Sequence, residues 1–443
     1  MTNAEEFDLV IGLGITGQSC VRYLVAQGMP LRALDTRAQP PGIEQLRSDY
    51  PQLPIHLGGW QESWLTAARR LIVSPGISLS TPQLAVQAAA GKEIVGDIEL
   101  FARAVNAPVA AITGSNAKST VTSMLGEVAH ACDQRTLAGG NLGTPALDLL
   151  STDTQLYVME LSSFQLETTY SLAAQVACIL NISQDHLDRY TSLSEYIAAK
   201  QRIYDGCSVA VWNADEPATR PQHPVPAQIS FGTDTSADYR LDRERGMLMA
   251  RGRDLLPLNR LTMRGHHNAL NVLAVLAMAE ALSLSMDDAL AAAAAFKGLP
   301  HRCELVTEHR GVQWFNDSKG TNAGATLAAL KGIGPAIDGR IVLIAGGQAK
   351  GQDFTELAAE SALWARAVVL IGEDAELLAE QFSGQQVYRE ADMRAAVSRA
   401  DALADSGDAV LLSPACASFD MYSGYVARGD DFVRQVREVC DAS

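Results

Sequence analysis

Short apolar runs that end in glycine or polar residues recur along the chain, and segments with helical spacing separate them. Near the start, β-rich runs cover Phe7 to Ile11, Leu31 to Leu34 and Leu71 to Val73, and a helical pattern through Val21 and Leu24 follows the first of them. Short apolar runs that alternate with helical segments predict the strands of a parallel sheet. In such a sheet, ligands bind at the carboxyl ends of the strands.

The same alternation continues to the end of the chain, interrupted by one long helical region and one irregular region. We expect a long alanine-rich helical region over about Asn268 to Phe296 and a helix over Asp430 to Val439. The stretch from Arg220 to Arg253 is rich in proline, glycine and charge, which predicts short β structure and loops. The further predicted strands are Pro108 to Thr113, Leu156 to Met159, Val176 to Ile182, Val312 to Phe315, Ile341 to Ala345, Val368 to Ile371 and Ala409 to Leu412.

These patterns place the chain in the α/β class and suggest several domains. Its 443 residues correspond to roughly three domains at about 150 residues each. The first α/β segment ends near Asp97, and the tetrapeptide Lys297-Gly298-Leu299-Pro300 is typical of a helix end and predicts a second boundary.

The composition narrows the class of protein. Apolar residues make up 47% of the chain and charged residues 19%, as in a folded globular protein. The net charge of −16 disfavours nucleic acid or an anionic membrane as a partner, although a local basic pocket remains compatible with it. The seven cysteines form no CxxC pair, no secretion signal opens the chain, and no apolar run reaches about 18 residues. We therefore expect a cytoplasmic protein.

The first motif is the glycine turn from Gly12 to Gly17, which follows a predicted strand and opens a helix. Backbone N–H groups at a helix start attract phosphate, and Asp35, about 20 residues further on, could accept hydrogen bonds from a ribose or a base. The motif alone does not separate NAD from another nucleotide. A tight turn without any ligand is the alternative.

The second motif, Thr113 to Thr120, is similar to a phosphate-binding loop between a strand and a helix. Lys118 would neutralise phosphate charge, and Ser119 or Thr120 would hold Mg²⁺. The loop carries Ala117 where such loops usually have glycine. A dehydrogenase needs only the first turn and a simple NTPase only the second. An enzyme that uses ATP to join a nucleotide-carrying substrate to another molecule needs both.

Further polar residues follow predicted strands. Glu160 ends a strand in the same α/β segment as Lys118, which suits Mg²⁺ bound to phosphates. Taken alone, His186 is more often structural than a ligand, and Lys200 is by default a solvated helix lysine. Cys416 has no histidine partner in the pattern, so we interpret it as a packed small residue.

Two more polar groups leave alternatives open. Asn268 and Asn271 share one helix face, where their amides could bind an adenine edge or cap the helix. The polar segment from Asn316 to Asn322 follows a predicted strand, and Arg302 and Lys350 add positive charge near strand ends. Surface salt bridges are the alternative for these two cations.

Taken in order, these motifs resemble the Mur ligase family, the ATP-dependent amide-forming enzymes of peptidoglycan precursor synthesis. The resemblance covers essentially the whole chain, and the stretch Asp317 to Asn322 is similar to the members that add D-glutamate. Its most specific segments are Thr113 to Thr120, Glu160 to Leu166, Asp185 to Tyr190, Leu299 to Arg302 and Asn316 to Asn322.

The resemblance implies three domains. Residues 1–97 would form a Rossmann-like domain that binds the UDP part of the substrate, so the Gly12 turn would not bind a dinucleotide. Residues 98–299 would form a central ATP-binding domain of the P-loop ATPase type. Residues 300–443 would form a second Rossmann-like domain that binds the acceptor amino acid.

The resemblance also implies roles for individual residues. Lys118, His186 and Lys200 would be catalytic. The implied UDP-substrate contacts are Ile15, Thr16, Asp35, Thr36, Arg37 and Asn141. The implied ATP contacts are Ser115, Asn116, Ala117, Lys118, Ser119, Thr120, Val121, Asn268, Asn271, Arg302 and Asp317. The implied Mg²⁺ ligands are Ser119, Glu160, His186 and Lys200, the last as a carbamate. The implied D-glutamate contacts are Lys319, Thr321, Lys350, Ser418 and Tyr425, where the family commonly has phenylalanine at the last position.

The implied reaction joins D-glutamate to UDP-N-acetylmuramoyl-L-alanine with ATP, Mg²⁺ and a CO₂-derived carbamate on Lys200. Its partners would be these small molecules, with no nucleic acid or membrane, and the enzyme would be a monomer. The nearest alternative is another amino-acid ligase of the same superfamily, which includes folate polyglutamate synthetases. A nicotinamide-dependent oxidoreductase and a nucleotide-binding sensor are the alternatives from other classes.

Overall fold

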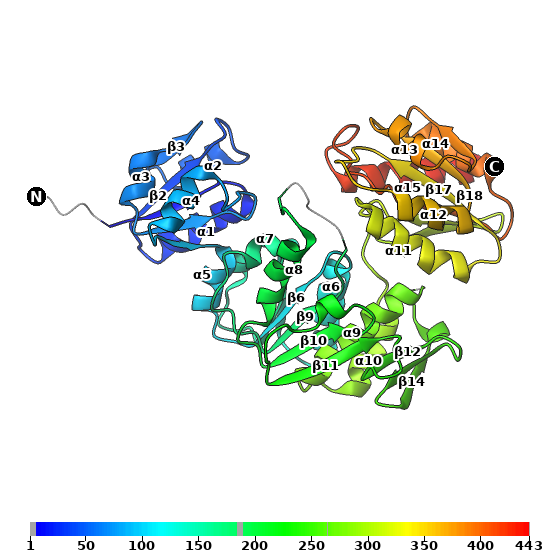
Figure 1. Cartoon of the computed structure of the whole chain (residues 1–443), viewed down its shortest axis with the longest axis horizontal. Coiled ribbons are helices and arrows are strands. Elements are labelled where there is room, and N and C mark those ends of the chain that lie inside the picture. Colours follow the sequence, from blue (N-terminus) through cyan, green and yellow to red (C-terminus); the bar gives the residue numbers. More distant parts are fainter. Residues whose placement is uncertain (1–5, 184–188, 264, 443) are drawn as a thin grey trace, which may run out of the picture. The chain divides into compact units, whose positions relative to one another are not determined.

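The computed structural model describes residues 6–183, 189–263 and 265–442, and Figure 1 shows the chain coloured along its sequence. The contacts within the chain divide it into two compact units. In its described residues, unit 1 runs to Ile182 and continues over 189–240 and Leu273–Ala293. Unit 2 contains Leu241–Val272 and the chain from Ala294 onward. Both units alternate strands and helices, as the sequence pattern predicts.

The first sheet of unit 1 is parallel and has the strand order β3-β2-β1-β4-β5. The order changes direction between β1 and β4, which is where an open α/β sheet binds its ligand. The strands are β1 (Asp8–Ile11), β2 (Leu31–Asp35), β3 (Ile55–Leu57), β4 (Arg70–Val73) and β5 (Glu93–Val95), and the helices are α1 (Ile15–Ala26), α2 (Ile43–Asp49), α3 (Glu62–Ala67) and α4 (Pro82–Ala89).

The second sheet runs through unit 1 in the order β12-β11-β10-β9-β6-β8-β7. Its strands are β6 (Val109–Thr113), β7 (Thr136–Gly140), β8 (Leu156–Glu160), β9 (Val176–Ile179), β10 (Val209–Asn213), β11 (Ala227–Gly232) and β12 (Tyr239–Asp242). The associated helices are α5 (Asp97–Ala104), α6 (Lys118–Ala131), η1 (Ala146–Leu149), α7 (Ser163–Leu166), α8 (Leu193–Gln201), η2 (Arg202–Tyr204) and η3 (Pro217–Thr219). The phosphate-loop candidate therefore joins a central strand, β6, to α6.

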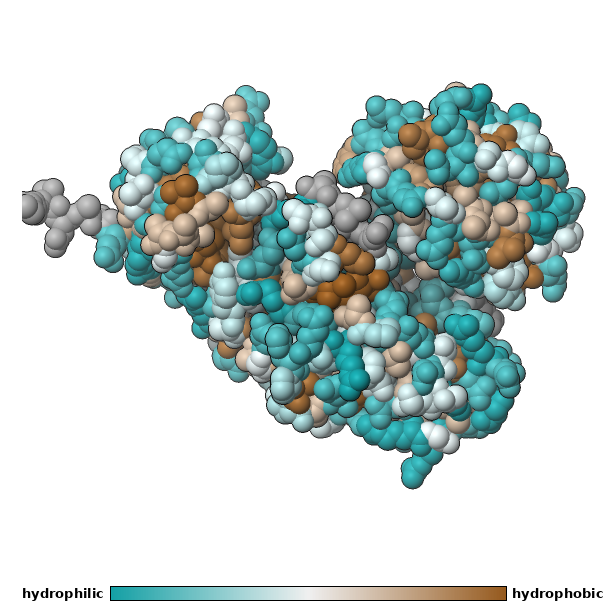
Figure 2. All heavy atoms as spheres, in the orientation of Figure 1, coloured by the Kyte–Doolittle hydropathy of each residue, from teal (hydrophilic) through white to brown (hydrophobic). Residues whose placement is uncertain are grey.

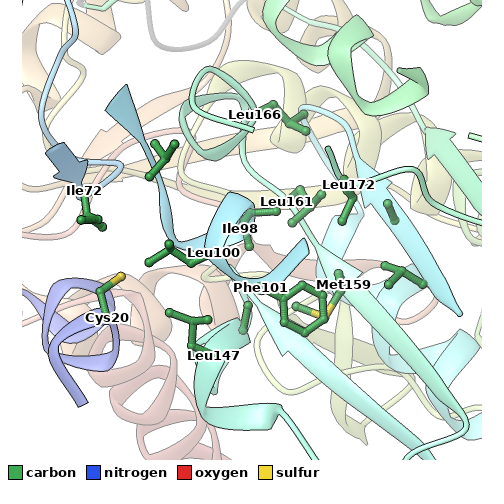
Figure 3. Packing of buried hydrophobic residues seen from close by; sticks show 14 of the residues in the cluster. Cys20, Ile72, Ile98, Leu100, Phe101, Leu147, Met159, Leu161, Leu166 and Leu172 are labelled. Atoms are coloured by element: carbon green, nitrogen blue, oxygen red, sulfur yellow. The ribbon is translucent and has the colours of Figure 1, made fainter. Parts of the chain in front are cut away.

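One apolar cluster continues from the first sheet to the second through α5. Ile98, Leu100 and Phe101 of this helix are at most 3% exposed. Figure 3 shows them between Cys20 and Ile72 of the first sheet's layer and a group from the second that consists of Met159, Leu161, Leu166 and Leu172. Because burial of apolar surface is the main source of stability, this shared cluster fixes the two sheets of unit 1 together.

The third sheet, in unit 2, has the order β15-β16-β20-β17-β18-β19, and only β15 is antiparallel to its neighbour among the described strands. Alternate residues of β17 belong to two different apolar clusters, so both faces of this sheet are covered. The strands are β15 (Glu304–His309), β16 (Val312–Asn316), β17 (Ile341–Gly346), β18 (Ala365–Ile371), β19 (Val387–Arg389) and β20 (Ala409–Leu412). The helices are α11 (Ala323–Ile333), η5 (Gly334–Ala336), α12 (Thr355–Trp364), α13 (Ala375–Gln381), α14 (Met393–Leu403) and α15 (Tyr425–Ala442).

The predicted helical region over Asn268 to Phe296 is present and contains two helices. They are α9 (His266–Ala281) and α10 (Met286–Ala295), with a break between them. Ser283 in the break has φ 57°, a left-handed conformation that a continuing helix cannot contain.

The predicted strand Val176 to Ile182 is too long, since β9 ends at Ile179 and the next residues turn toward the phosphate loop.

The irregular region from Arg220 to Arg253 does contain short strands, as predicted. The hairpin of β13 (Met247–Ala250) and β14 (Arg253–Pro257), followed by η4 (Leu258–Arg260), extends this region.

Figure 2 shows hydrophilic residues over much of the visible face, with smaller apolar patches. No helix in the described part of the chain is long and apolar enough to span a membrane.

Candidate functional site

The glycine turn lies at the carboxyl edge of the first sheet, between β1 and α1. Gly12 has φ 89°, and the hydroxyl of Ser74, which follows β4, donates to its carbonyl oxygen at 2.7 Å. A Cβ on Gly17 would lie 1.8 Å from the same carbonyl, so the helix can start this close to the strand only with glycine there. This close approach is what a phosphate-type turn requires.

Asp35 organises the same edge from the end of β2. Its carboxylate accepts from the Leu13 N–H at 2.7 Å and from the Arg37 guanidinium at 2.7 and 3.0 Å. Burial acts to raise the pKa of Asp35, but these hydrogen bonds outweigh burial and hold the pKa below its usual value. Ile15 is 74% exposed, and Thr36 and Arg37 are exposed at the same edge. The structure therefore brings together the five predicted UDP contacts of this domain.

The phosphate-loop candidate is held in shape by Asn181, which the sequence patterns did not single out. Its side chain accepts from the Asn116 N–H at 2.7 Å and donates to the Asn116 carbonyl at 3.1 Å. Its own carbonyl accepts from the Ser115 N–H at 3.0 Å. Ala117 then takes φ 64° and ψ −2°, the left-handed conformation that favours glycine, and α6 begins at the next residue. Three bonds to one asparagine thus fix the loop before the helix.

Two predicted catalytic lysines converge on this loop. Lys118 and Lys200 each donate to the Gly114 carbonyl oxygen at 2.9 Å. The Lys200 side chain is 1% exposed, and its ammonium lies 4.5 Å from the centre of the Tyr196 ring. Lys200 is therefore not the solvated helix lysine that its sequence context alone suggests.

Glu160 is a buried carboxylate at the end of β8, 2% exposed. Asn141 donates to its Oε1 at 2.7 Å, while its Oε2 is buried and has no hydrogen-bond partner among the described residues. A buried carboxylate oxygen without a donor is costly unless a cation or a ligand meets it. Its chemistry fits Mg²⁺, which prefers carboxylate and hydroxyl oxygens. Ser119, another predicted metal ligand, is the second residue of α6, whereas His186 lies outside the described residues.

The predicted adenine contacts lie in unit 2. Asn268 and Asn271 are each 8% exposed on α9, and the Asn271 side chain donates to the Asn268 side-chain oxygen at 3.2 Å. The two amides therefore act as one paired polar group. The remaining predicted ATP contacts of the phosphate loop, Ser115 to Val121, lie in unit 1.

Asp317 follows β16 and is buried at 7% exposure. Burial raises its pKa to about 6, although the Ser413 hydroxyl at 2.7 Å, the Cys303 N–H at 3.1 Å and the charge of Arg302 favour the ionised form. The predicted ribose contact is therefore a hydrogen-bonded carboxyl that takes up a proton at higher pH than an exposed aspartate does. The predicted phosphate contact, Arg302, lies close enough to act on its charge.

The predicted D-glutamate contacts are distributed over the loops that follow β16, β17 and β20. The Lys319 ammonium lies 4.2 Å from the centre of the Tyr425 ring, and the exposed Lys350 lies 5.8 Å from that of Phe419. Ser418 is 3% exposed and Thr321 is half-buried. Because parallel strands present their carboxyl ends at one edge of a sheet, these residues share that edge.

Arg428 of α15 is a buried cation that none of the sequence motifs indicates. It is 1% exposed and donates to the Ser318 carbonyl at 2.9 Å, the Ser318 hydroxyl at 3.1 Å and the Cys416 carbonyl at 3.1 Å. Burial lowers its pKa to about 10. It ties together the loops after β16 and β20, and its partners lie too far along the chain for any sequence pattern to indicate them.

Three family models match the chain in order. They are the Mur ligase MurD-like N-terminal domain over residues 6–96, the Mur ligase middle domain over 112–279, and the Mur ligase glutamate ligase domain over 301–416. Two curated relatives carry the name UDP-N-acetylmuramoylalanine--D-glutamate ligase. The protein from Alcanivorax borkumensis is 61% identical over 434 residues, which is 98% of each chain. The protein from Pseudomonas aeruginosa is 49% identical and covers 98% of this chain and 99% of its own.

Solved structures of similar fold have lower identity. A UDP-N-acetylmuramate-alanine ligase, MurC, from Thermotoga maritima matches with a TM-score of 0.61 at 19% identity, over 98% of this chain and 99% of that one. MurF ligase from the same organism, solved in complex with ADP, matches with a TM-score of 0.62 at 16% identity, over 85% of this chain and 90% of that one. These two comparisons concern the fold.

Proposed function

The chain belongs to the Mur ligase family, and from this premise we propose that it joins D-glutamate to UDP-N-acetylmuramoyl-alanine at the expense of ATP, a step of peptidoglycan precursor synthesis. The observation that carries the proposal is the 61% identity, over 98% of both chains, to a ligase named for that reaction. The fold agrees with it, since two α/β sheets of unit 1 each present a phosphate-type turn at a carboxyl edge.

The reaction needs ATP because a carboxylate has no adequate leaving group. Transfer of the γ-phosphoryl group to the alanine carboxylate gives an acyl phosphate and ADP. The amine of D-glutamate then attacks the acyl carbon, the tetrahedral intermediate loses phosphate, and the ammonium proton passes to solvent or base. No protein nucleophile is required, so positioning and electrostatic stabilisation supply the catalysis.

In this proposal the phosphate loop and Lys118 hold the transferred phosphoryl group. The loop's backbone N–H groups at the start of α6 and the ammonium of Lys118 offset its negative charge. Glu160, Ser119 and His186 would hold Mg²⁺. When bound, the ion neutralises charge on the phosphate oxygens.

We assign Lys200 a carbamate in the working enzyme. Its burial and its position at the Gly114 carbonyl, shared with Lys118, support this assignment, because carbamylation turns a second cation at the loop into an anion that can join the Mg²⁺ ligands. The carbamate would require the Lys200 ammonium to release its present hydrogen bonds.

The other binding roles follow the three domains predicted from the sequence. Residues 1–97 would bind the UDP part through the edge that Asp35 organises, residues 98–299 would bind ATP, and residues 300–443 would bind the acceptor. Lys319 and Lys350 are suited to the two carboxylates of D-glutamate. We expect a cytoplasmic monomer that acts on small molecules.

Phosphate release tests the function directly. The purified protein is given UDP-N-acetylmuramoyl-L-alanine, ATP and Mg²⁺ with D-glutamate, L-glutamate or no acceptor. We expect release only with D-glutamate, and none from Lys118→Ala, which should still bind the UDP-substrate. Equal release with another amino acid would favour a different ligase of the superfamily, and release that ignores the acceptor would refute ligation.

The carbamate has its own test. Lys200→Ala should be severely impaired, and the wild-type enzyme should lose activity when CO₂ and bicarbonate are removed and regain it when bicarbonate is added. Near-normal turnover by Lys200→Ala, or turnover independent of bicarbonate, would remove the carbamate while leaving the ligase function in place.

A further inference from the structure

Arg189 is a nearly buried cation that connects two parts of unit 1. Its guanidinium donates to the Glu167 carboxylate at 2.6 Å and to the Pro75 carbonyl at 3.0 Å, and it lies 4.4 Å from the centre of the Phe164 ring. The Arg189 and Glu167 side chains are 10% and 17% exposed. A planar guanidinium can make two directed bonds and stack on a ring at once, which a lysine cannot do.

The Pro75 end of this connection belongs to the first sheet. Pro75 follows β4, next to Ser74, whose hydroxyl is bonded to the carbonyl of Gly12 in the glycine turn. Arg189 therefore holds the edge of the first sheet at the turn that we propose for the UDP-substrate. Arg189 and Glu167 themselves lie in segments that belong to the layer of the second sheet.

The neighbouring residue extends the connection to the phosphate loop. The Tyr190 hydroxyl donates to the other oxygen of Glu167 at 2.7 Å, and its ring lies 5.3 Å from that of Tyr196. The Tyr196 hydroxyl in turn lies 3.1 Å from the Ser115 hydroxyl in the phosphate loop. Packed rings and hydrogen bonds thus run without interruption from Pro75 to Ser115.

We infer that Arg189, anchored by Glu167, is a positioning residue. It aligns the edge of the first sheet, where we propose that the UDP-substrate binds, with the phosphate loop. The inference rests on the proposed function and deepens it, because phosphoryl transfer needs the alanine carboxylate and the γ-phosphate aligned. Arg189 itself would bind neither substrate. Its effect is on alignment, where a displacement of about 1 Å can cost about 100-fold in rate.

A second ion pair of the same unit provides a matched control. Arg22 of α1 bonds both carboxylate oxygens of Asp148 in η1, with Nε to Oδ1 at 3.2 Å, so it also joins the layers of the first and second sheets. Neither residue has a described contact with the glycine turn or the phosphate loop. Arg22→Lys therefore weakens the contact between the layers without the proposed alignment role.

The first experiment compares Arg189→Lys, Glu167→Gln and Arg22→Lys in steady-state kinetics and thermal unfolding. We expect kcat of Arg189→Lys and Glu167→Gln to fall 10- to 100-fold, by about the range given for misplacement. ATP binding measured with the nucleotide alone and KM for D-glutamate should change less than about threefold, because neither contact is altered. Arg22→Lys should keep kcat even where its Tm falls as much.

The second experiment does not depend on turnover and uses UDP as the probe. In the wild-type protein, UDP should slow amide hydrogen exchange in residues 114–121, and Arg189→Lys should bind UDP but lose that effect. Any of three results would overturn the inference: an unchanged kcat in Arg189→Lys, an equal loss of kcat in Arg22→Lys, or amide exchange in the wild-type loop that does not change when UDP binds. If instead UDP slows exchange as expected but the wild-type protein consumes no ATP with D-glutamate, the proposed function fails and the structural link stands.

Discussion

Asp97, at the start of α5, gives a test of the electrostatics where the two sheets of unit 1 meet. The carboxylate is 2% exposed; its Oδ2 accepts from the Gln165 side chain at 3.0 Å, and its Oδ1 is buried with no hydrogen-bond partner among the described residues. Burial raises the pKa of Asp97 from 3.8 to about 6, against the opposing effects of Gln165 and backbone N–H groups. Its charge is therefore unfavourable in the folded protein.

The pKa shift sets the size and the sign of the effect. A rise of about two units in the pKa corresponds to about 3 kcal/mol. This is the extra free energy that ionisation of Asp97 costs in the folded state relative to the unfolded state. The folded state binds more protons than the unfolded state between pH 4 and 6, so the contribution of Asp97 to stability falls as pH rises through that window. Asp97 destabilises the folded protein by the full amount at pH values above its folded-state pKa, and not at all below its unfolded-state pKa.

Asp97→Asn removes the charge and keeps the shape and the acceptor for Gln165. The added amide N–H groups cost about 1–2 kcal/mol if they find no acceptor, so we expect a net gain of about 1–2 kcal/mol in the free energy of unfolding at pH 8. At pH 4 the variant should be equal to the wild type or less stable. Urea unfolding, followed by far-UV circular dichroism across this pH range, measures the difference.

The difference in the free energy of unfolding between Asp97→Asn and the wild type isolates the effect of Asp97 from that of the other titrating groups. Asp148→Asn, at a more exposed carboxylate, serves as the control and should show no gain that grows with pH. If the difference between Asp97→Asn and the wild type is the same at pH 4 and pH 8, or becomes less favourable to the variant as pH rises, then burial does not govern this carboxyl and the reasoning is refuted.

Three further predictions concern single residues. Asn181→Ala should raise KM for ATP at least tenfold, since it removes both side-chain bonds that hold Asn116; steady-state kinetics check this, and an unchanged KM would contradict it. Ala117→Gly should stabilise the protein by up to about 1 kcal/mol, because relief of the left-handed conformation exceeds the greater freedom of glycine in the unfolded chain; a lower urea midpoint would show the opposite. Asp8→Ala should cost about 3 kcal/mol, because Asp8 is fully buried between Arg69 and Arg70 and its loss leaves their charge unbalanced; unfolding measured at neutral pH should show at least half that loss.

Features that depend on neighbouring residues could be predicted from the sequence. The strands that precede Gly12, Gly114 and Asp317 are apolar runs that end in small or polar residues, and each is found where the pattern places it. The turn at Gly12 is indicated by the local spacing of glycines, because the shortest contact of a side chain at Gly17, with the Gly12 carbonyl oxygen, is formed within the turn itself.

Features that depend on distant partners could not. The bonds of Asn181 to the phosphate loop span 65 residues, and those of Arg428 to Ser318 span 110. The break at Ser283 inside the predicted helical region could not be placed, because alanine-rich sequence continues on both sides of it and a single left-handed residue decides where the helix ends. Several short strands, among them β3 and β19, have only partly buried or exposed residues and so carry no clear apolar pattern.

The phosphate loop shows why a chain with a net charge of −16 can still serve an anionic substrate. The ammonium groups of Lys118 and Lys200 both donate to the Gly114 carbonyl oxygen, so two positive charges lie at the phosphate loop of this acidic chain. Like charges at such a site favour the approach of an anion, whether a polyphosphate or a carbamate formed on one of the lysines. The two anions can be distinguished. Bound polyphosphate should stabilise the loop increasingly as the ATP concentration rises, whereas carbamylation should stabilise it when bicarbonate alone is added. The local arrangement of charge therefore decides what binds, and the net charge of the chain does not.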